Sequence, residues 1–398
     1  MTAGIRTLAL AGALFSSSAW SAKLIASHFS GNLYSLTLSD SGELTVDSET
    51  SSGNFWPAWL DLDTESRTLY VPDESDWAPP NGLVTFTVGE DGSLTRGDEG
   101  QTVTQGGEVH STLYGGQDGK GFIAFAHYGS SKVTTFQLPL TSNSQVLQTF
   151  DFSSIPTGPH DRQDASHPHG VHLDPSGGYI LAPDLGGDVV HIFAIDQETG
   201  SLTECDAAAT QPGDGPRHAA YWAGSDGGDA ELVFTVNELA NTVTAWDVSY
   251  PEEGGGCLSL SPLQTLSTLP EGVDPPEGSK AAEIRVRDNF VYVSNRYDRS
   301  FGDEQDSLAT FEIVLPTNGT LELVFVELTN SESYFPRTFQ INAEGNLVAV
   351  GGQTSSNVVI LERNMETGRL GDVVAQVQVG EVGTPLEEDG LSAVIWVE

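Results

Sequence analysis

Three histidines stand close together in the stretch "ASHPHGVHLDPSGGYILAPDLGGDVVHIFAID", which runs from Ala165 to Asp196. Histidine is the side chain whose unperturbed pKa lies nearest to neutral pH, so a histidine at a strand end is a candidate general acid or base. His167 and His169 also have the His-x-His spacing of metal ligands, but the sequence fixes no third ligand. We therefore predict neither metal nor other cofactor, and we assign proton transfer to His169.

Basic residues are scarce in this chain, which makes each arginine informative. The sequence has 16 Lys and Arg against 56 Asp and Glu, for a net charge of −40. Such a surface repels nucleic acids and anionic membranes, so we expect neither as a partner. Arg217, Arg296 and Arg337 nevertheless stand at the ends of short apolar runs. A guanidinium fork matches a carboxylate, and these positions therefore predict a site for a carboxylate-bearing anion.

These residues belong to a pattern that recurs along the chain. Each copy is an apolar strand, a polar break, a second alternating strand, a turn rich in Gly, Asp or Asn, and the start of a third strand. The seven copies begin at Leu24, Leu69, Phe122, Tyr179, Leu232, Phe290 and Leu347. Their spacing of about 45–65 residues is typical of propeller blades, and helical periodicity is nearly absent. We predict an all-β chain in which residues 23–398 form one seven-bladed β-propeller, with a pair of β-sandwiches as the alternative.

The two ends of the chain are expected to form one blade together. A further short strand precedes every copy except the first, and a spare strand, "LSAVIWVE", ends the chain. We expect this C-terminal strand to complete the first blade and close the ring.

Blade geometry then predicts which residues share one mouth of the channel. The first strand of a blade starts at the same face at which the antiparallel second strand ends. The predicted first-strand positions are Ala58, His110, His169, Arg217, Glu283, Arg337 and Ala393. The predicted second-strand positions are Glu74, Tyr128, Leu185, Glu238, Arg296, Gln353 and Phe29. An alternative is that Arg217 and Arg337 form structural salt bridges with Glu238 and Glu283 between blades.

Side-chain alternation predicts different roles for the three histidines. His169 faces the mouth by its place in the repeat, and His167, two residues earlier, shares its direction. His172 lies three residues further on, so we expect it to face away and to pack between blades. We count Arg162, in the same block of sequence, with His167 as substrate-binding.

The N-terminus and the cysteines predict the compartment. Residues 1–22 have one arginine, an apolar run and then small residues, which is typical of a secretory signal peptide, although a soluble N-terminal helix is the alternative. No other stretch is long and apolar enough to span a membrane. Cys205 and Cys257 form a disulfide if the compartment is oxidising, or stay free thiols if it is not. Asn318 begins an Asn-Gly-Thr sequon for glycosylation. We expect a secreted, extracellular monomer.

The blocks "DRQDASHPHGVHLDPSGGYILAPDLGGD", "GPRHAAYW", "VYVSNRYD" and "FPRTFQIN" together resemble the lactonase-type seven-bladed propellers. That family includes bacterial 6-phosphogluconolactonases and fungal 3-carboxy-cis,cis-muconate cyclases, and the likeness covers nearly the whole chain after residue 22. The resemblance to the cyclase branch implies that His169, Arg217, Glu238 and Arg296 are catalytic. It leaves His110, His167, Tyr128, Arg162, Glu283, Arg337 and Gln353 as substrate-binding candidates. The secretory signal and the strong negative charge depart from the intracellular cyclase.

Three functions follow from these residues. The leading hypothesis is an enzyme of the cycloisomerase or lactonase type that acts on a small or terminal carboxylate. The second is a secreted polysaccharide lyase that cleaves rhamnose–glucuronate linkages by β-elimination, a chemistry also known on a similar propeller. The third is a secreted propeller that only binds its ligand, since folds do not dictate function. The first two share an arginine clamp for a carboxylate and a group that moves one proton.

Overall fold

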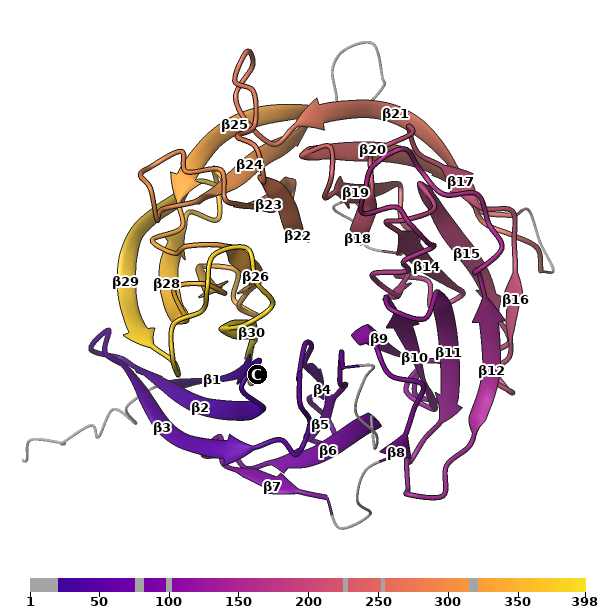
Figure 1. Cartoon of the computed structure of the whole chain (residues 1–398), viewed down its shortest axis with the longest axis horizontal. Coiled ribbons are helices and arrows are strands. Elements are labelled where there is room, and N and C mark those ends of the chain that lie inside the picture. Colours follow the sequence, from indigo (N-terminus) through magenta and orange to yellow (C-terminus); the bar gives the residue numbers. More distant parts are fainter. Residues whose placement is uncertain (1–20, 76–81, 98–101, 225–227, 252–254, 315–320) are drawn as a thin grey trace, which may run out of the picture.

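The computed structural model describes residues 21–75, 82–97, 102–224, 228–251, 255–314 and 321–398. Every regular element in these ranges is a β-strand. The strands form seven antiparallel sheets that are arranged as blades around a common axis (Figure 1). The predicted seven-bladed β-propeller is thereby confirmed.

The blades follow the chain in order, and the strands of each blade succeed one another from the inside of the ring to the outside. Blade 1 is β30 (Leu391–Trp396), β1 (Ser21–His28), β2 (Asn32–Ser39) and β3 (Leu44–Ser51). Blade 2 is β4 (Asp61–Asp63), β5 (Thr68–Val71), β6 (Gly82–Val88) and β7 (Leu94–Arg96), with β8 (Thr102–Val103) beside β6. Blade 3 is β9 (Glu108–Tyr114), β10 (Phe122–His127), β11 (Lys132–Gln137) and β12 (Val146–Asp151).

The remaining four blades have the same order. Blade 4 is β13 (His172–Leu173), β14 (Tyr179–Asp184), β15 (Val189–Ile195) and β16 (Leu202–Glu204), with β17 (Ala208–Ala209) beside β15. Blade 5 is β18 (Pro216–Trp222), β19 (Leu232–Asn237), β20 (Thr242–Ser249) and β21 (Ser259–Ser267). Blade 6 is β22 (Lys280–Arg287), β23 (Phe290–Arg296), β24 (Ser307–Val314) and β25 (Glu322–Asn330). Blade 7 is β26 (Pro336–Ile341), β27 (Leu347–Gly352), β28 (Asn357–Arg363) and β29 (Leu370–Gln378).

The C-terminal strand closes the ring, as predicted. β30 pairs antiparallel with β1, with Ile395 opposite Ile25 and Val394 opposite Ala26. All six residues of β30 are buried. The two ends of the chain therefore share one sheet, and β30 takes the innermost position in blade 1.

Apolar side chains fill the spaces between neighbouring blades. The described residues hold seven buried clusters, one at each junction between blades, such as Phe122 with Phe193 between blades 3 and 4 and Phe234 with Phe311 between blades 5 and 6. Middle strands are buried on both faces, which is why they read as continuous apolar runs in the sequence. Outer strands such as β12 alternate between half-buried and exposed residues instead.

A bulge interrupts the innermost strand where it leaves the mouth. In blade 5, Pro216 pairs with Asn237. The next pair is His218 with Val236, so Arg217 has no partner of its own. A bulge of this kind adds one residue to one strand and re-aims its side chain. It changes the side-chain alternation from which the mouth positions were predicted.

A disulfide joins blades 4 and 5 at the outside of the ring. Cys205, just after β16, is bonded to Cys257, just before β21, with their Cα atoms 5.6 Å apart. No helix long and apolar enough to cross a membrane occurs in the described ranges. The predicted sequon at Asn318 and residues 1–20 of the predicted signal peptide lie outside the described residues.

Candidate active site at one mouth of the channel

A cavity of about 300 Å³ opens at one mouth of the channel. Its lining comes from loops and strand ends of six blades, and most of it is charged or aromatic. The lining residues are Trp56, Glu74, Tyr128, Gly129, Arg162, His169, Glu238, Arg296, Arg337 and Glu388. Five of the predicted site residues on different strands therefore share one cavity with Arg162 from the loop before β13.

Buried carboxylates at the ends of second strands hold the loops that form this mouth. Asp184, the last residue of β14, accepts hydrogen bonds from the backbone N–H of His167 at 2.7 Å and of Gly186 at 3.0 Å. Asp73 accepts from the backbone N–H groups of Phe55 and Trp56 in the same manner. Each carboxylate satisfies donors that a buried loop would otherwise leave unpaired.

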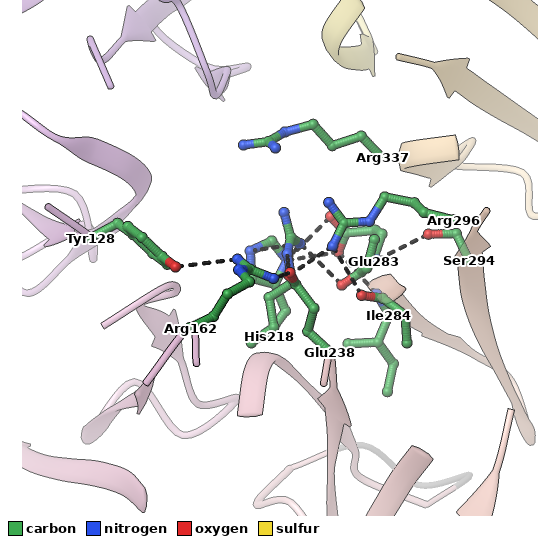
Figure 2. Close-up of polar contacts among 12 residues, drawn as sticks. Tyr128, Arg162, His218, Glu238, Glu283, Ile284, Ser294, Arg296 and Arg337 are labelled. Carbon is green, nitrogen blue, oxygen red and sulfur yellow. Dashed lines mark hydrogen bonds and ion pairs between the residues drawn. The ribbon is translucent and has the colours of Figure 1, made fainter. Parts of the chain in front are cut away.

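Glu238, directly after β19, is the centre of a cluster of arginines. Its carboxylate lies 2.7 Å from Nη2 of Arg296 and 3.0 Å from Nε of Arg217, and it also pairs with Nη1 of Arg162. Figure 2 shows Arg162 between Glu238 and the hydroxyl of Tyr128. Burial opposes ionisation, but the combined attraction of the three guanidinium groups holds the pKa of Glu238 well below its usual value. A carboxylate with such a low pKa is a weak base, so Glu238 positions the arginines.

Arg217 lies behind the wall of the mouth cavity. Its side chain is 2% exposed and does not line the cavity. Its Nη1 donates to the backbone carbonyl of Ala282 at 3.0 Å, while Nε faces Glu238. Arg217 was predicted to be catalytic at the mouth, and the structure instead places its guanidinium behind the cavity wall, where Glu238 and the backbone carbonyl of Ala282 hold it. Its salt bridge with Glu238 agrees with the structural alternative.

A second ion cluster stands at the opposite wall of the cavity. Arg337 pairs with Glu74 at 3.2 Å and with Glu388 at 3.1 Å. Burial raises the pKa of Glu74 to about 7, against the attraction of Arg337. Burial acts on Glu388 too, but Arg337, Arg296 and Lys280 outweigh it, and the pKa of Glu388 is lowered. The two carboxyl groups that share one arginine thus differ in protonation near neutral pH, a common arrangement of acid–base sites.

His169 lines the cavity as predicted, in its neutral form. Burial, with the charge of Arg217 next in size, lowers the pKa of His169 well below its ordinary value. Its Nδ1 is buried and has no hydrogen-bond partner among the described residues. A buried ring nitrogen without a partner is costly unless a ligand or water satisfies it.

His167 supports the cavity wall and does not line it. Its ring stacks on Tyr128, with centroids 4.2 Å apart and an interplanar angle of 12°. Its Nδ1 lies 2.8 Å from the backbone carbonyl of Tyr128, and its Nε2 lies 3.1 Å from Asp164. Tyr128 and Arg162, by contrast, reach the cavity as predicted.

Three further predicted substrate-binding residues lie elsewhere. His110 lines a second cavity inside the channel, and Glu283 contacts Nδ1 of His218 at 3.3 Å. Both were assigned one residue too far along their strands, because the bulge shifts the register after the mouth position. Gln353 is fully buried, and its Nε2 donates to the carbonyl of Glu387, which anchors the loop that carries Glu388.

The prediction for His172 was wrong. Pro168 pairs with Asp184, and His172 pairs with Leu181, which leaves one extra residue between the two pairs. This bulge cancels the expected change of face, and His172 points into the channel, where its ring lies 4.6 Å from that of His110.

The sequence predicted no role for three residues of the lining, Gly129, Glu388 and Trp56. Glu388 stands in an acidic loop before β30, and one more acid among 56 carries no signal. Trp56 follows β3 at no repeat position. Only the folded loops bring these residues to the mouth.

Comparison with known proteins agrees with the fold. The family model described as "Lactonase, 7-bladed beta-propeller" matches residues 23–386. A protein of Arthroderma benhamiae named "Probable 6-phosphogluconolactonase" is 29% identical, over 82% of this chain and 81% of its own. The "6-phosphogluconolactonase" of Bacillus subtilis is 28% identical, over 79% of this chain and 82% of its own. A crystal structure of a Bacteroides fragilis protein described as a putative 6-phosphogluconolactonase superposes with a TM-score of 0.76 at 23% identity, covering 96% of this chain and 99% of that one.

Proposed function

The chain belongs to the lactonase family of seven-bladed β-propellers, and from that premise we propose that it hydrolyses the lactone of an anionic sugar acid in the mouth cavity. One observation carries this proposal. Three arginines, a neutral histidine and a carboxyl group with a pKa of about 7 line one cavity of about 300 Å³. The names of the two curated relatives support the same reaction class.

The arginines suit an anionic substrate. Four guanidinium groups, those of Arg162, Arg217, Arg296 and Arg337, face the three carboxyl groups of Glu74, Glu238 and Glu388. Counted with Arg217 behind the wall, the guanidinium groups of this cluster outnumber its carboxyl groups by one in a protein whose net charge is −40. This excess grows when Glu74 is protonated. An acidic group of the substrate replaces part of the water around the guanidinium groups, and bidentate pairing fixes its orientation.

Lactone hydrolysis needs a base for water and positive charge for the carbonyl oxygen. Glu74, with its pKa of about 7, is partly ionised at neutral pH and suits the role of general base. Water attacks the lactone carbonyl and gives its proton to Glu74. The acyl–oxygen bond then breaks, and the leaving ring oxygen takes this proton from Glu74 and becomes a hydroxyl, which restores the base. Arg296 and Arg337 stabilise the negative charge that forms on the carbonyl oxygen, which typically contributes about 3–4 kcal/mol for one such donor. His169 offers its unpartnered ring nitrogen to the water or to the ring oxygen that leaves.

We propose that this reaction takes place outside the cell and that the enzyme acts as a monomer. The predicted signal peptide supports export, and the bonded pair Cys205–Cys257 suits an oxidising compartment. The net negative charge keeps copies of the chain apart.

The reaction class is tested by turnover in ¹⁸O-labelled water. We expect the protein to open 6-phosphogluconolactone or gluconolactone faster than the spontaneous reaction and to place one ¹⁸O in the carboxylate. The matched control is Arg296→Lys, which keeps the charge but loses the fork, and it should lose most of the enzyme-dependent rate.

Three other outcomes would replace the proposal. Cyclisation of a carboxylated muconate without uptake of label would show a cycloisomerase. A new conjugated double bond from a rhamnosyl-glucuronate glycan would show a lyase. Tight binding of these compounds without any turnover would show a binding propeller.

A further inference from the structure

Three imidazole rings converge inside the channel, deeper than the mouth cavity. His110 and His172 line a second cavity of about 450 Å³, and His218 is buried beside them. Arg217 separates this group from the mouth, because its Nη1 lies 3.3 Å from the ring of His218 while its Nε faces Glu238. None of the three rings touches the lining of the proposed active site except through the contact of His218 with His169.

The three histidines are brought together by equivalent strands of consecutive blades. They come from β9, β13 and β18, the innermost strands of blades 3, 4 and 5. One ring nitrogen from each lies within 4.8 Å of those of the other two. The ring centroids are 4.6, 4.9 and 5.3 Å apart.

The surroundings of His218 orient its ring. Its Nδ1 lies 3.3 Å from the buried carboxylate of Glu283. Nη1 of Arg217 lies 3.3 Å from Nε2, so this guanidinium must turn aside before Nε2 can bind a metal ion. A carboxylate behind a histidine is the usual outer partner of a metal-binding imidazole. Trp59 covers the ring of His110 at a centroid distance of 4.1 Å, which limits the rotation of that ring.

We propose that His110, His172 and His218 bind one divalent transition metal ion of the zinc class in the channel. Three imidazoles suit Zn²⁺, Co²⁺, Ni²⁺ or Cu²⁺ far better than Mg²⁺ or Ca²⁺. Three protein ligands leave a fourth position for water or a ligand oxygen. Two of the three histidines, His110 and His172, line the 450 Å³ cavity, from which such a ligand would come. Asp61 and Arg285 line the same cavity and would meet whatever occupies it.

Three features of this arrangement oppose binding and limit the expected affinity: the spacing of the ring nitrogens, two hydrogen bonds to the rings, and the Arg217 guanidinium 3.3 Å from Nε2 of His218. Tetrahedral zinc with bonds of about 2.0–2.1 Å needs nitrogens roughly 3.3 Å apart, so the rings must move inward. The backbone N–H groups of Val171 and Ala219 donate to His110 at 3.4 Å and to His172 at 3.2 Å. Metal binding puts the ring proton on the nitrogen that faces the amide and so breaks these long hydrogen bonds. We therefore expect affinity weaker than that of a site with three carboxylate-backed histidines.

The test uses Co²⁺ as a spectroscopic probe on the full-length protein after treatment with a chelator. We expect one Co²⁺ per chain with the intense visible bands of four-coordinate cobalt, and displacement of these bands by Zn²⁺. His110→Ala and His172→Ala should each weaken binding at least tenfold. The matched control is His160→Ala, which removes an exposed histidine outside the cluster and should leave binding unchanged.

These measurements distinguish metal binding by the three histidines from metal binding by surface carboxylates. X-ray absorption of the zinc-loaded wild type should show three imidazole nitrogens, a measurement that does not depend on whether the variants fold. Weak, six-coordinate cobalt spectra that both variants leave unchanged would overturn the proposal. Lactone turnover at the mouth should survive the chelator, so a failure of the metal site and a failure of the proposed function would be told apart.

Discussion

At the scale of single residues, the carboxyl groups of the mouth cavity have different pKa values because their surroundings differ. Glu238 faces three arginines and keeps a low pKa, whereas Glu74 has one arginine partner and a pKa raised by burial to about 7. Each group therefore suits one role, Glu238 as an anchor for arginines and Glu74 as a base. His169 stays neutral across the same range of pH.

Glu74→Gln should abolish the pH dependence of turnover near neutrality. A base acts only when it is deprotonated, so kcat/KM of the wild type should rise with pH up to about 7 and then level off. Below that pH the rate should fall about tenfold per unit. Glu74→Gln should be slower by roughly 10²–10⁴ and flat between pH 5 and 8. A variant that keeps the rise near pH 7 would assign it to another group.

His169→Asn and His172→Asn should show in which of the two cavities turnover takes place. His169 lines the mouth and should be required for turnover, while His172 lines the deeper cavity and should be dispensable for it. Because the pKa of His169 is held well below its ordinary value, the residual activity of His169→Asn should keep the rise near pH 7. Steady-state pH profiles of both variants check this, with melting temperatures to confirm folding. Loss of turnover in His172→Asn alone would place the reaction in the deeper cavity.

At the scale of elements, buried aspartates at the ends of the second strands of blades 2 and 4 hold the mouth loops in place. Asp184 accepts from two further donors besides its backbone partners, the hydroxyl of Ser166 at 2.5 Å and Nε2 of His191 at 3.1 Å. This carboxylate thus ties the loop that carries His167 and His169 to two strands of blade 4. The loop has little regular structure of its own, so its shape depends on such anchors.

Asp184→Ala should destabilise the protein and disturb the site together. Several buried donors lose a charged acceptor, and we expect a loss of roughly 3 kcal/mol in the free energy of unfolding. Asp196→Ala is the matched control, because Asp196 accepts from two backbone N–H groups in an exposed turn and should cost about 1 kcal/mol or less. Denaturant titrations of both variants measure the difference. Equal losses would mean that burial of Asp184 contributes nothing.

At the scale of the whole molecule, the ring is closed by a strand from the other end of the chain, and the net charge is strongly negative. β30 supplies the inner edge of blade 1 and packs against blades 2 and 7 through the adjoining clusters. The local excess of arginine at the mouth stands inside a strongly negative molecule. Ring closure affects the folding of the whole protein, and the net charge affects its association with charged substrates.

Deletion of residues 391–398 should prevent folding. Leu391, Val394, Ile395 and Trp396 are all buried, and at roughly 1.5–3 kcal/mol each their burial is comparable with the total stability of about 5–15 kcal/mol of a typical domain. Deletion of Val397 and Glu398 alone leaves β30 intact and should be tolerated. Circular dichroism and size-exclusion chromatography distinguish the two. A truncated protein with the wild-type melting temperature would show that blade 1 does not need β30.

Added salt should raise kcat/KM for an anionic lactone. The net charge of −40 repels the substrate at long range, while the arginines at the mouth act only at short range. Raising the ionic strength from about 0.01 to 0.15 M shortens the screening length from about 30 to 8 Å and removes most of the repulsion. We expect a several-fold gain for the anionic lactone and little change for an uncharged one. A fall with salt would show that the mouth arginines dominate association.

The sequence by itself determined the blade count, the ring closure and the convergence of distant charged residues on one mouth. These follow from strand periodicity and from the antiparallel rule, which need only local patterns. The sequence did not determine whether a given side chain lines the mouth cavity or lies deeper in the channel. A bulge adds one residue without leaving a signal in the pattern, and it shifted His110, Glu283 and His172 from their predicted places. The depth of Arg217 depends instead on its contacts with Glu238 and the carbonyl of Ala282, which the sequence does not show. The roles of Glu74 and Glu388 likewise depend on burial and on Arg337, which belongs to another blade, and such contacts exist only in the folded ring.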